Sequence, residues 1–365
     1  MEPAIAKSEP SYYELLRESP EGKFRGERGG TKLSQIERAM INNPILPPHS
    51  ADPWMIFHEG FYYYCQSAHG DTGIRIRKSS TLAGIAQDEG IVVWNAPERG
   101  MNAREVWAPE IHFINGKFFI YYAADDGDNL NHRMWVLESE TANPLGRYVC
   151  RGALPTGGWA IDGTPLILAD GRMFFVWSGW RGRRNGQQNL YIAPMNNPFA
   201  LGGRRVLICE PDQKWERVTM PICEGPQVLQ NNGKVFIVYS ASASWTEDYC
   251  LGLLTNTDGD MLNPASWVKR PTPVFQKTEH VWGLGHCSFV KSPCQTRDFI
   301  VYHAKSSKKE GWADRDVHAK QFAWTADGLP DFGVPAPRAS TIPFTPDWSP
   351  ADDNLYPKTR NELAA

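Results

Sequence analysis

Three acidic residues stand in short motifs of a kind that supports catalysis: Asp52 in Asp-Pro-Trp, Asp162 in Ile-Asp-Gly-Thr and Glu224 in Cys-Glu-Gly-Pro. Carboxyl groups that meet in one pocket repel one another, so such a pocket needs a chemical reason. The common reason is hydrolysis of a glycosidic bond, in which one carboxyl group protonates the leaving oxygen and another activates water or attacks the sugar. Asp before Pro or Gly is also a frequent turn residue, so each motif alone fits a turn equally well.

The three motifs belong to a repeat of five segments, in which a short polar or Pro-containing motif is followed by a turn and a dense apolar or aromatic strand pattern. We take Asp52, Trp107, Asp162, Glu224 and His286 as markers of the repeat. The steps between markers are 55 residues (52 to 107), 55 (107 to 162), 62 (162 to 224) and 62 (224 to 286). One four-stranded blade of a β-propeller requires a period of this length. The repeat therefore predicts an all-β fold, a five-bladed β-propeller.

The strand patterns place the propeller at residues 41–345 as a single domain. A polar N-terminal extension (1–40) with one helix-like segment (33–40) precedes it, and a C-terminal tail (346–365) follows. The innermost strands of a propeller surround the central axis, so equivalent positions of successive blades converge at one end of the channel. The three carboxyl groups should therefore share one pocket. Matching places in three blades favour catalysis over turns.

Composition excludes several classes of partner. The formal net charge is -3 and the basic residues are scattered, so we expect neither nucleic acid nor an anionic membrane as a partner. No apolar run reaches the length of a membrane span or resembles a signal peptide, and no N-x-S/T sequon occurs, so we expect a cytoplasmic protein.

The seven cysteines include no C-x-x-C pair, which disfavours a zinc site and favours reduced thiols. The high aromatic content, 12%, suits either a β-rich core or a surface that stacks on sugars.

The order of the motifs DPW, WAPEI, IDGT, WSGW, CEGP, SAS, GHCSF, IVYHA and DGLPDFGVP resembles glycoside hydrolase family 43 from about residue 43 to 335. The resemblance implies a five-bladed propeller that hydrolyses α-L-arabinofuranosides or β-xylosides with inversion, without a required cofactor. The tract with NHRMWVLES, GGWAIDGT and QNLYIAPM is most similar to exo-acting α-L-arabinofuranosidases that trim arabinan or arabinoxylan. An arabinose-containing oligosaccharide or polysaccharide is then the expected substrate. Oligomeric state is left open.

The family's roles carry over to the three matching carboxyl groups. The resemblance implies that Asp52 is the general base, that Glu224 is the general acid, and that Asp162 orients the acid and raises its pKa. Electrostatics agrees, because nearby carboxylates would hold the proton of Glu224 to higher pH. Inversion further predicts that Asp52 and Glu224 lie roughly 6.5 to 9.5 Å apart, which leaves room for one water.

Aromatic and polar residues near the motifs are candidates for substrate binding. By the repeat, Trp107 and Glu110 should face the pocket, with Trp107 against the sugar and Glu110 accepting hydrogen bonds from sugar hydroxyls or from an arginine. Trp54 and Trp177 are further candidate walls. The alternative for Trp107 is burial in the blade core.

Three positions near the fourth and fifth motifs leave alternatives open. His286 matches a family histidine that binds substrate or helps hold Ca²⁺ or another cation through water, although a lone His is more often structural. Arg315 matches a late family arginine that contacts the site, and a solvated surface Arg is an equal alternative. Cys223 stands where the family usually has Asn, so the support of Glu224 could be altered. A cysteine nucleophile is disfavoured because no base lies nearby in the sequence.

Two other functions remain. The same fold could act on β-xylosides or on internal bonds of arabinan, because α-L-arabinofuranose and β-D-xylopyranose present similar hydroxyl arrangements. A non-catalytic propeller could also bind glycans by aromatic stacking, since a fold does not by itself define a function. The three carboxyl groups argue against this last alternative, because a protein that only binds glycans has no reason to keep them together.

Overall fold

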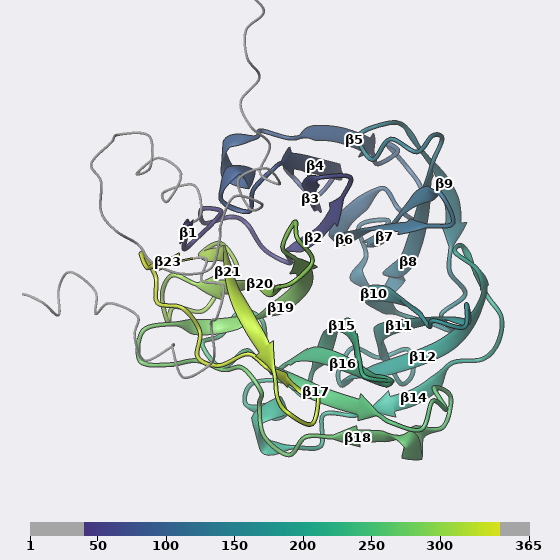
Figure 1. Cartoon of the computed structure of the whole chain (residues 1–365). Coiled ribbons are helices and arrows are strands. Elements are labelled where there is room, and N and C mark those ends of the chain that lie inside the picture. The colour runs from purple at the N-terminus through teal and green to yellow at the C-terminus, as the bar shows by residue number, and fades with distance from the viewer. Residues whose placement is uncertain (1–39, 344–365) are drawn as a thin grey trace, which may run out of the picture.

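The computed structural model describes residues 40–343, and these form the predicted five-bladed β-propeller, with the blades arranged around a central axis (Figure 1). The expected N-terminal extension, its helix-like segment and the C-terminal tail lie outside the described residues, apart from Met40. Helical structure among residues 40–343 consists of four short 3₁₀ helices: η1 (Ala83–Gln87), η2 (Asn129–Asn131), η3 (Lys214–Arg217) and η4 (Pro264–Ser266). None of these helices is long and apolar enough to cross a membrane.

Each blade is an antiparallel sheet whose strands follow one another in sequence, starting from the innermost strand, which lines the central channel of a propeller. The first blade contains β2 (Trp54–His58), β3 (Phe61–Ser67), β4 (Gly73–Ser79) and β5 (Ile91–Asn95). The second contains β6 (Arg104–Ile114), β7 (Lys117–Asp125), β8 (Arg133–Ser139) and β9 (Tyr148–Ala153). The third contains β10 (Ala160–Ile167), β11 (Met173–Trp180), β12 (Gln188–Asn197), β13 (Ala200–Leu201) and β14 (Val206–Cys209).

The last two blades repeat the four-stranded pattern. The fourth contains β15 (Cys223–Asn231), β16 (Lys234–Ala241), β17 (Cys250–Asn256) and β18 (Trp267–Lys269). The fifth contains β19 (Trp282–Lys291), β20 (Asp298–Lys305), β21 (Arg315–Trp324) and β22 (Pro330–Asp331). The third blade departs from the pattern because both β13 and β14 pair with β12, which gives it five strands.

Tight hairpins join the two innermost strands in several blades. In the second blade Asn115 and Gly116 have φ values of 50° and 83°, and in the fourth blade Asn232 and Gly233 have 48° and 75°. Two consecutive residues with positive φ give the two-residue hairpin whose twist matches the flanking strands, and Asn-Gly is its preferred sequence. These turns bring each aromatic second strand directly back beside the channel-lining strand.

The first and fifth blades pack together and close the ring. β1 (Met40–Asn42) pairs with β23 (Thr341–Pro343), so the two ends of the described chain meet. The side chain of Asn43 donates to the carbonyl of Ala319 at 3.0 Å and accepts from its N–H at 2.9 Å. Apolar side chains from both blades then form one buried cluster, with Met55 and Tyr64 on one side and Val301 and Val317 on the other. Burial of this cluster holds the channel in one geometry.

Candidate active site

In each blade, one residue near the start of the channel-lining strand has a positive φ, in the left-handed region of backbone conformation. The φ values are 48° for Asp52, 43° for Ala108, 54° for Asp162, 53° for Gly225 and 41° for His286. In the second to fifth blades the strand register shifts at this residue, which identifies a β-bulge. The predicted markers Asp52, Asp162 and His286 are themselves the residues of positive φ, whereas Trp107 and Glu224 precede such a residue by one position. Left-handed backbone at non-glycine residues is costly and is concentrated at functional sites.

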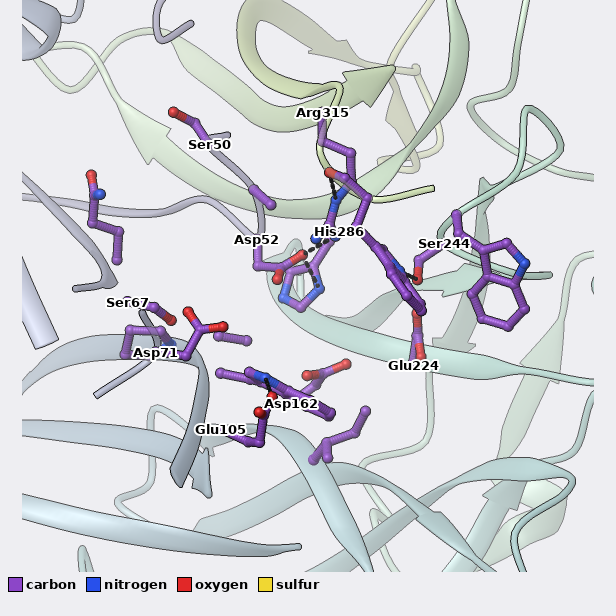
Figure 2. A pocket seen from close by; sticks show the side chains of 18 of the residues that line it. Ser50, Asp52, Ser67, Asp71, Glu105, Asp162, Glu224, Ser244, His286 and Arg315 are labelled. Carbon is purple, nitrogen blue, oxygen red and sulfur yellow. Dashed lines mark hydrogen bonds and ion pairs between the residues drawn. The ribbon is translucent and has the colours of Figure 1, made fainter. Parts of the chain in front are cut away.

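The bulges surround a pocket of about 900 Å³ at one end of the channel. Six of the nine residues predicted for the site line this pocket: Asp52, Trp107, Asp162, Glu224, His286 and Arg315. Figure 2 shows Asp52, Asp162, Glu224 and His286 extending into it from four different blades. The convergence expected from the repeat is therefore observed.

Asp52 is surrounded by nitrogen atoms. Its Oδ1 lies 3.1 Å from Nη1 of Arg315, 3.3 Å from Nδ1 of His286 and 3.3 Å from Nδ1 of His303. Burial by itself raises the pKa of Asp52. The charge of Arg315, the electrostatic interaction with His286 and the hydrogen bond with His303 outweigh burial and hold the pKa well below its usual range. This carboxyl group is ionised at neutral pH and suits a general base.

Glu224 has the opposite electrostatic environment. Its side chain is buried, and its Oε1 accepts a hydrogen bond of 2.8 Å from the hydroxyl of Tyr249. Burial is the largest cause of its raised pKa of about 7, the Asp52 carboxylate adds to the rise, and the Tyr249 hydrogen bond opposes it. Glu224 therefore keeps its proton well above the pH at which an exposed glutamic acid loses it, as a general acid must.

Asp162 is tied to the backbone beside the acid. Its Oδ2 accepts a hydrogen bond of 3.0 Å from the N–H of Gly225, the residue after Glu224. Burial raises the pKa of Asp162, the charge of His286 lowers it, and Glu224 raises it again. Asp162 thus holds the main chain beside Glu224, and the charge of Glu224 in turn raises the pKa of Asp162. Burial is the largest cause of the raised pKa of both carboxyl groups.

Three residues predicted for the pocket lie elsewhere, and these expectations are corrected. Trp177 is fully buried between the second and third blades, and Trp54 packs in the core of the first two blades, where its Nε1 donates to the carbonyl of Ile111 at 2.6 Å.

Glu110 is only 2% exposed and contacts the side chains of Gln227 and His112. Burial raises the pKa of Glu110 to about 8, so it is a neutral core residue.

Trp107 lies at the pocket in a fixed orientation. Its indole stacks on His132 with ring centroids 4.1 Å apart, and its Nε1 donates to Oε2 of Glu105 at 3.0 Å. Glu105 and Asp71 also line the pocket, and both have left-handed backbone. Figure 2 shows these two carboxyl groups near each other, on the side away from Glu224. This acidic wall was not predicted, because nothing in the repeat marks it.

Two further residues missed by the motif analysis support the carboxyl groups directly: His303 on β20, beside Asp52, and Tyr249 before β17, beside Glu224. Their rings stack with centroids 5.5 Å apart and an interplanar angle of 9°. Burial lowers the pKa of His303 to about 4, so its imidazole is neutral at neutral pH. His303 stands in the motif IVYHA and could have been found there, whereas Tyr249 carries no sequence signal.

The residues around His286 do not fit a directly bound cation. The neighbouring carboxylate, Asp52, already pairs with the guanidinium of Arg315, and a metal ion would compete with that charge. The cation implied by the resemblance stays a prediction. Within residues 40–343, one group of three metal-ligating side chains comes within 4.8 Å, Cys209, Glu216 and Cys223. Its carboxylate is already neutralised by Lys269, whose Nζ lies 2.9 Å from Oε1 of Glu216.

The thiol of Cys223 points away from the acid that follows it in sequence. Its Sγ lies 3.8 Å from Sγ of Cys209 and 3.7 Å from Oε1 of Glu216, in the core between the third and fourth blades. Burial raises the pKa of this thiol well above its usual range, so it is neither a nucleophile nor a support for Glu224. Tyr249 supplies the hydrogen bond to the acid instead.

The fold and the pocket define a propeller in which three carboxyl groups with different environments meet, an arrangement that suits a glycoside hydrolase. Residues 41–330 match the model of Glycosyl hydrolases family 43, and the chain belongs to this family. It is 35% identical over 314 residues to "Alpha-L-arabinofuranosidase 43" of Humicola insolens, covering 82% of this chain and 64% of that protein.

A second sequence relative and a solved structure are also named arabinofuranosidases. The chain is 37% identical over 308 residues to "Extracellular exo-alpha-(1->5)-L-arabinofuranosidase" of Streptomyces avermitilis, covering 81% of this chain and 63% of the relative. The crystal structure of an alpha-L-arabinofuranosidase from Lactobacillus brevis superposes with a TM-score of 0.76 at 34% identity and covers 81% of this chain and 97% of that one. The chain thus spans slightly less than two thirds of the length of the two sequence relatives, but almost all of the solved structure.

Proposed function

We propose that this protein is an inverting, exo-acting glycoside hydrolase that releases terminal α-L-arabinofuranosyl residues from arabinan or arabinoxylan oligosaccharides. One observation carries the proposal: a carboxylate held ionised by Arg315 shares a pocket with a buried Glu224 that keeps its proton. Two carboxyl groups with opposite environments are what acid–base cleavage of a glycosidic bond needs. The names of three relatives support arabinofuranose as the sugar that is released.

In this mechanism Asp52 removes a proton from water as the water attacks the anomeric carbon, and Glu224 protonates the leaving oxygen on the other side of the ring. Arg315 and His286 keep Asp52 ionised and fix its direction. Asp162 holds the backbone at Gly225 and so positions the acid. Trp107, clamped by His132 and Glu105, packs against the ring of the sugar that is released.

The test is hydrolysis of a chromogenic α-L-arabinofuranoside beside the matching β-D-xyloside, followed by proton NMR of the first product formed. Preference for the arabinoside, and initial release of the β-anomer from the α-glycoside, support the proposal. Preference for the xyloside would change the substrate class, and release of mixed oligosaccharides from arabinan would contradict exo action. A folded protein that cleaves neither compound would favour a glycan-binding propeller.

A further inference from the structure

Two tryptophans stand at the rim of the pocket, on loops that join the second and third strands of neighbouring blades. Trp245 lies in the connection between β16 and β17, and Trp312 lies in the connection between β20 and β21; both line the pocket. Their rings meet edge to face, with centroids 5.4 Å apart and an interplanar angle of 65°. The indole of Trp312 is 56% exposed, which is unusual for the largest apolar side chain.

The exposed indole is held in place rather than free to move. Its Nε1 donates to Oγ of Ser244 at 3.1 Å, and the N–H of Gly311 donates to the carbonyl of Trp245 at 2.9 Å, so the two loops are joined. The carbonyl of Trp312 accepts a hydrogen bond of 3.2 Å from Nε of Arg315. The ring therefore offers a rigid apolar face to solvent, which suits recognition because little conformational entropy is lost when a ligand packs on it.

The tryptophan pair lies on the side of the acid. The connection between β16 and β17 carries Ser244 and Trp245 and also Tyr249, whose hydroxyl binds Glu224. Figure 2 shows Ser244 beside Glu224, whereas Asp71 and Glu105 lie on the opposite side. A general acid must reach the oxygen that leaves, so the leaving group of a bound glycoside lies on the side of Glu224. The tryptophan pair therefore lies where the leaving part of a bound oligosaccharide would be. The acidic wall, Asp71 and Glu105, faces the sugar that is released.

We propose that Trp312, supported edge-on by Trp245, is the platform on which the leaving arabinosyl ring stacks, and that it selects oligosaccharides over simple arabinosides. The C–H face of a sugar ring is apolar, and packing on an indole removes both surfaces from water. This inference deepens the proposed function and depends on it. It assigns specificity for the leaving group to a residue at the rim of the pocket, outside the set of three carboxyl groups.

The experiment compares Trp312→Ala with wild type on linear α-1,5-arabinotriose and on methyl α-L-arabinofuranoside, whose leaving group has no ring to stack. The substitution removes the indole but keeps the backbone carbonyl that Arg315 binds. We expect KM for arabinotriose to rise roughly 10- to 30-fold, and the loss of kcat/KM on arabinotriose to exceed the loss on the methyl glycoside by about tenfold. Trp312→Phe should recover most of the difference.

Phe113→Ala is the matched control, because Phe113 is an exposed aromatic residue of the second blade, 44% accessible, that does not line the pocket. Equal losses on both substrates would show a merely structural role for Trp312, and no loss on either would remove it from substrate binding; both results overturn the inference. Wild-type protein that cleaves neither substrate contradicts the proposed function itself, and the inference falls with it. Wild-type cleavage with an unaffected variant contradicts the inference alone.

Discussion

Asp52 and Arg315 are joined by a hydrogen-bonded ion pair of 3.1 Å between Oδ1 and Nη1, although 263 residues separate them in sequence. The pair links the first blade to the fifth, across the point where the ring closes. Both side chains lie at the pocket, so the contact affects the charge of the proposed base as well as the structure. The guanidinium is also bound to the Trp312 carbonyl, which connects the base to the rim of the pocket.

Replacement of Arg315 by Met should move the acid limb of the activity profile to higher pH. The folded-state pKa of Asp52 is depressed, so its ionised form is present at and above the ordinary range and is lost only as pH falls through the depressed value. Without the guanidinium that pKa should rise by about 1 to 3 pH units. The measurement is kcat/KM between pH 3 and 7. Arg315→Lys, which keeps a cation, is the control and should shift the limb less; an unmoved limb in Arg315→Met would show that the two imidazoles suffice.

Glu224→Gln should lower kcat/KM for arabino-oligosaccharides by about 10²–10⁴-fold, the range that general acid catalysis contributes. The loss should shrink on an aryl arabinoside with a strongly acidic phenol, since such a leaving group departs without a proton. Rates on the two substrate types measure this difference. Glu210→Gln is a matched control, because Glu210 forms an exposed ion pair with Arg181 and does not line the pocket. Equal losses on both substrate types would argue against an acid role.

Asp162→Asn should move the basic limb of the profile to lower pH. Glu224 must be protonated to act, and its pKa is raised to about 7, so activity falls as pH rises through that value. The charge of Glu224 raises the pKa of Asp162. Because the coupling between two titrating groups is mutual, removal of the Asp162 charge should let Glu224 ionise at lower pH. The amide oxygen of Asn can still accept from Gly225 N–H, so the backbone is kept. A profile of kcat/KM between pH 5 and 9 checks this, and a basic limb in its wild-type position would mean that Asp162 does not contribute to the pKa of Glu224.

The fold and the meeting of the carboxyl groups could be predicted because both follow from spacing. Equivalent residues of successive blades converge whatever the loops do, and this placed Asp52, Asp162 and Glu224 in one pocket. Side-chain direction could not be predicted, because successive residues of a strand face opposite sides of the sheet and the motifs do not show which side is which. Trp54 and Trp177 were placed wrongly in the pocket, although both belong to the motifs; their side chains pack between blades instead. Trp312, on a loop outside the repeat, gave no signal at all.

Cys223→Ala should leave kcat/KM within about threefold of wild type while it lowers the free energy of unfolding by roughly 1 to 3 kcal/mol, the usual cost of a deletion in a core. The thiol packs against Cys209 and Glu216 and does not support the acid that follows it. Denaturant unfolding and steady-state kinetics give the two quantities. Cys294→Ala, at a partly exposed position on the fifth blade, is the control for loss of a thiol. A large loss of activity at unchanged stability would show that Cys223 does support Glu224.

Gly225→Ala and Gly233→Ala separate the steric demands of the site from the cost of left-handed backbone. Both glycines have positive φ, 53° and 75°, and at Gly233 an added Cβ meets nothing within 4 Å. At Gly225 the Cβ would lie 3.1 Å from Oγ of Ser240 and 3.3 Å from Cγ of His286. Both variants should lose about 1 to 2 kcal/mol of stability from the backbone. Gly225→Ala should lose roughly 1 to 3 kcal/mol more from overpacking.

The activity of the two glycine variants should differ more than their stability. Gly225 follows Glu224, its N–H donates to Asp162, and its missing side chain makes room for His286 beside Asp52. A displaced His286 and a shifted backbone would move base and acid together, so kcat/KM of folded Gly225→Ala should fall at least about 10²-fold. Gly233 lies in the hairpin between β15 and β16, at the opposite end of β15 from Gly225. Folded Gly233→Ala should therefore keep wild-type activity. Circular dichroism confirms folding before the rates are compared, and equal rates for the two variants would show that the pocket adapts to an added methyl group beside its acid.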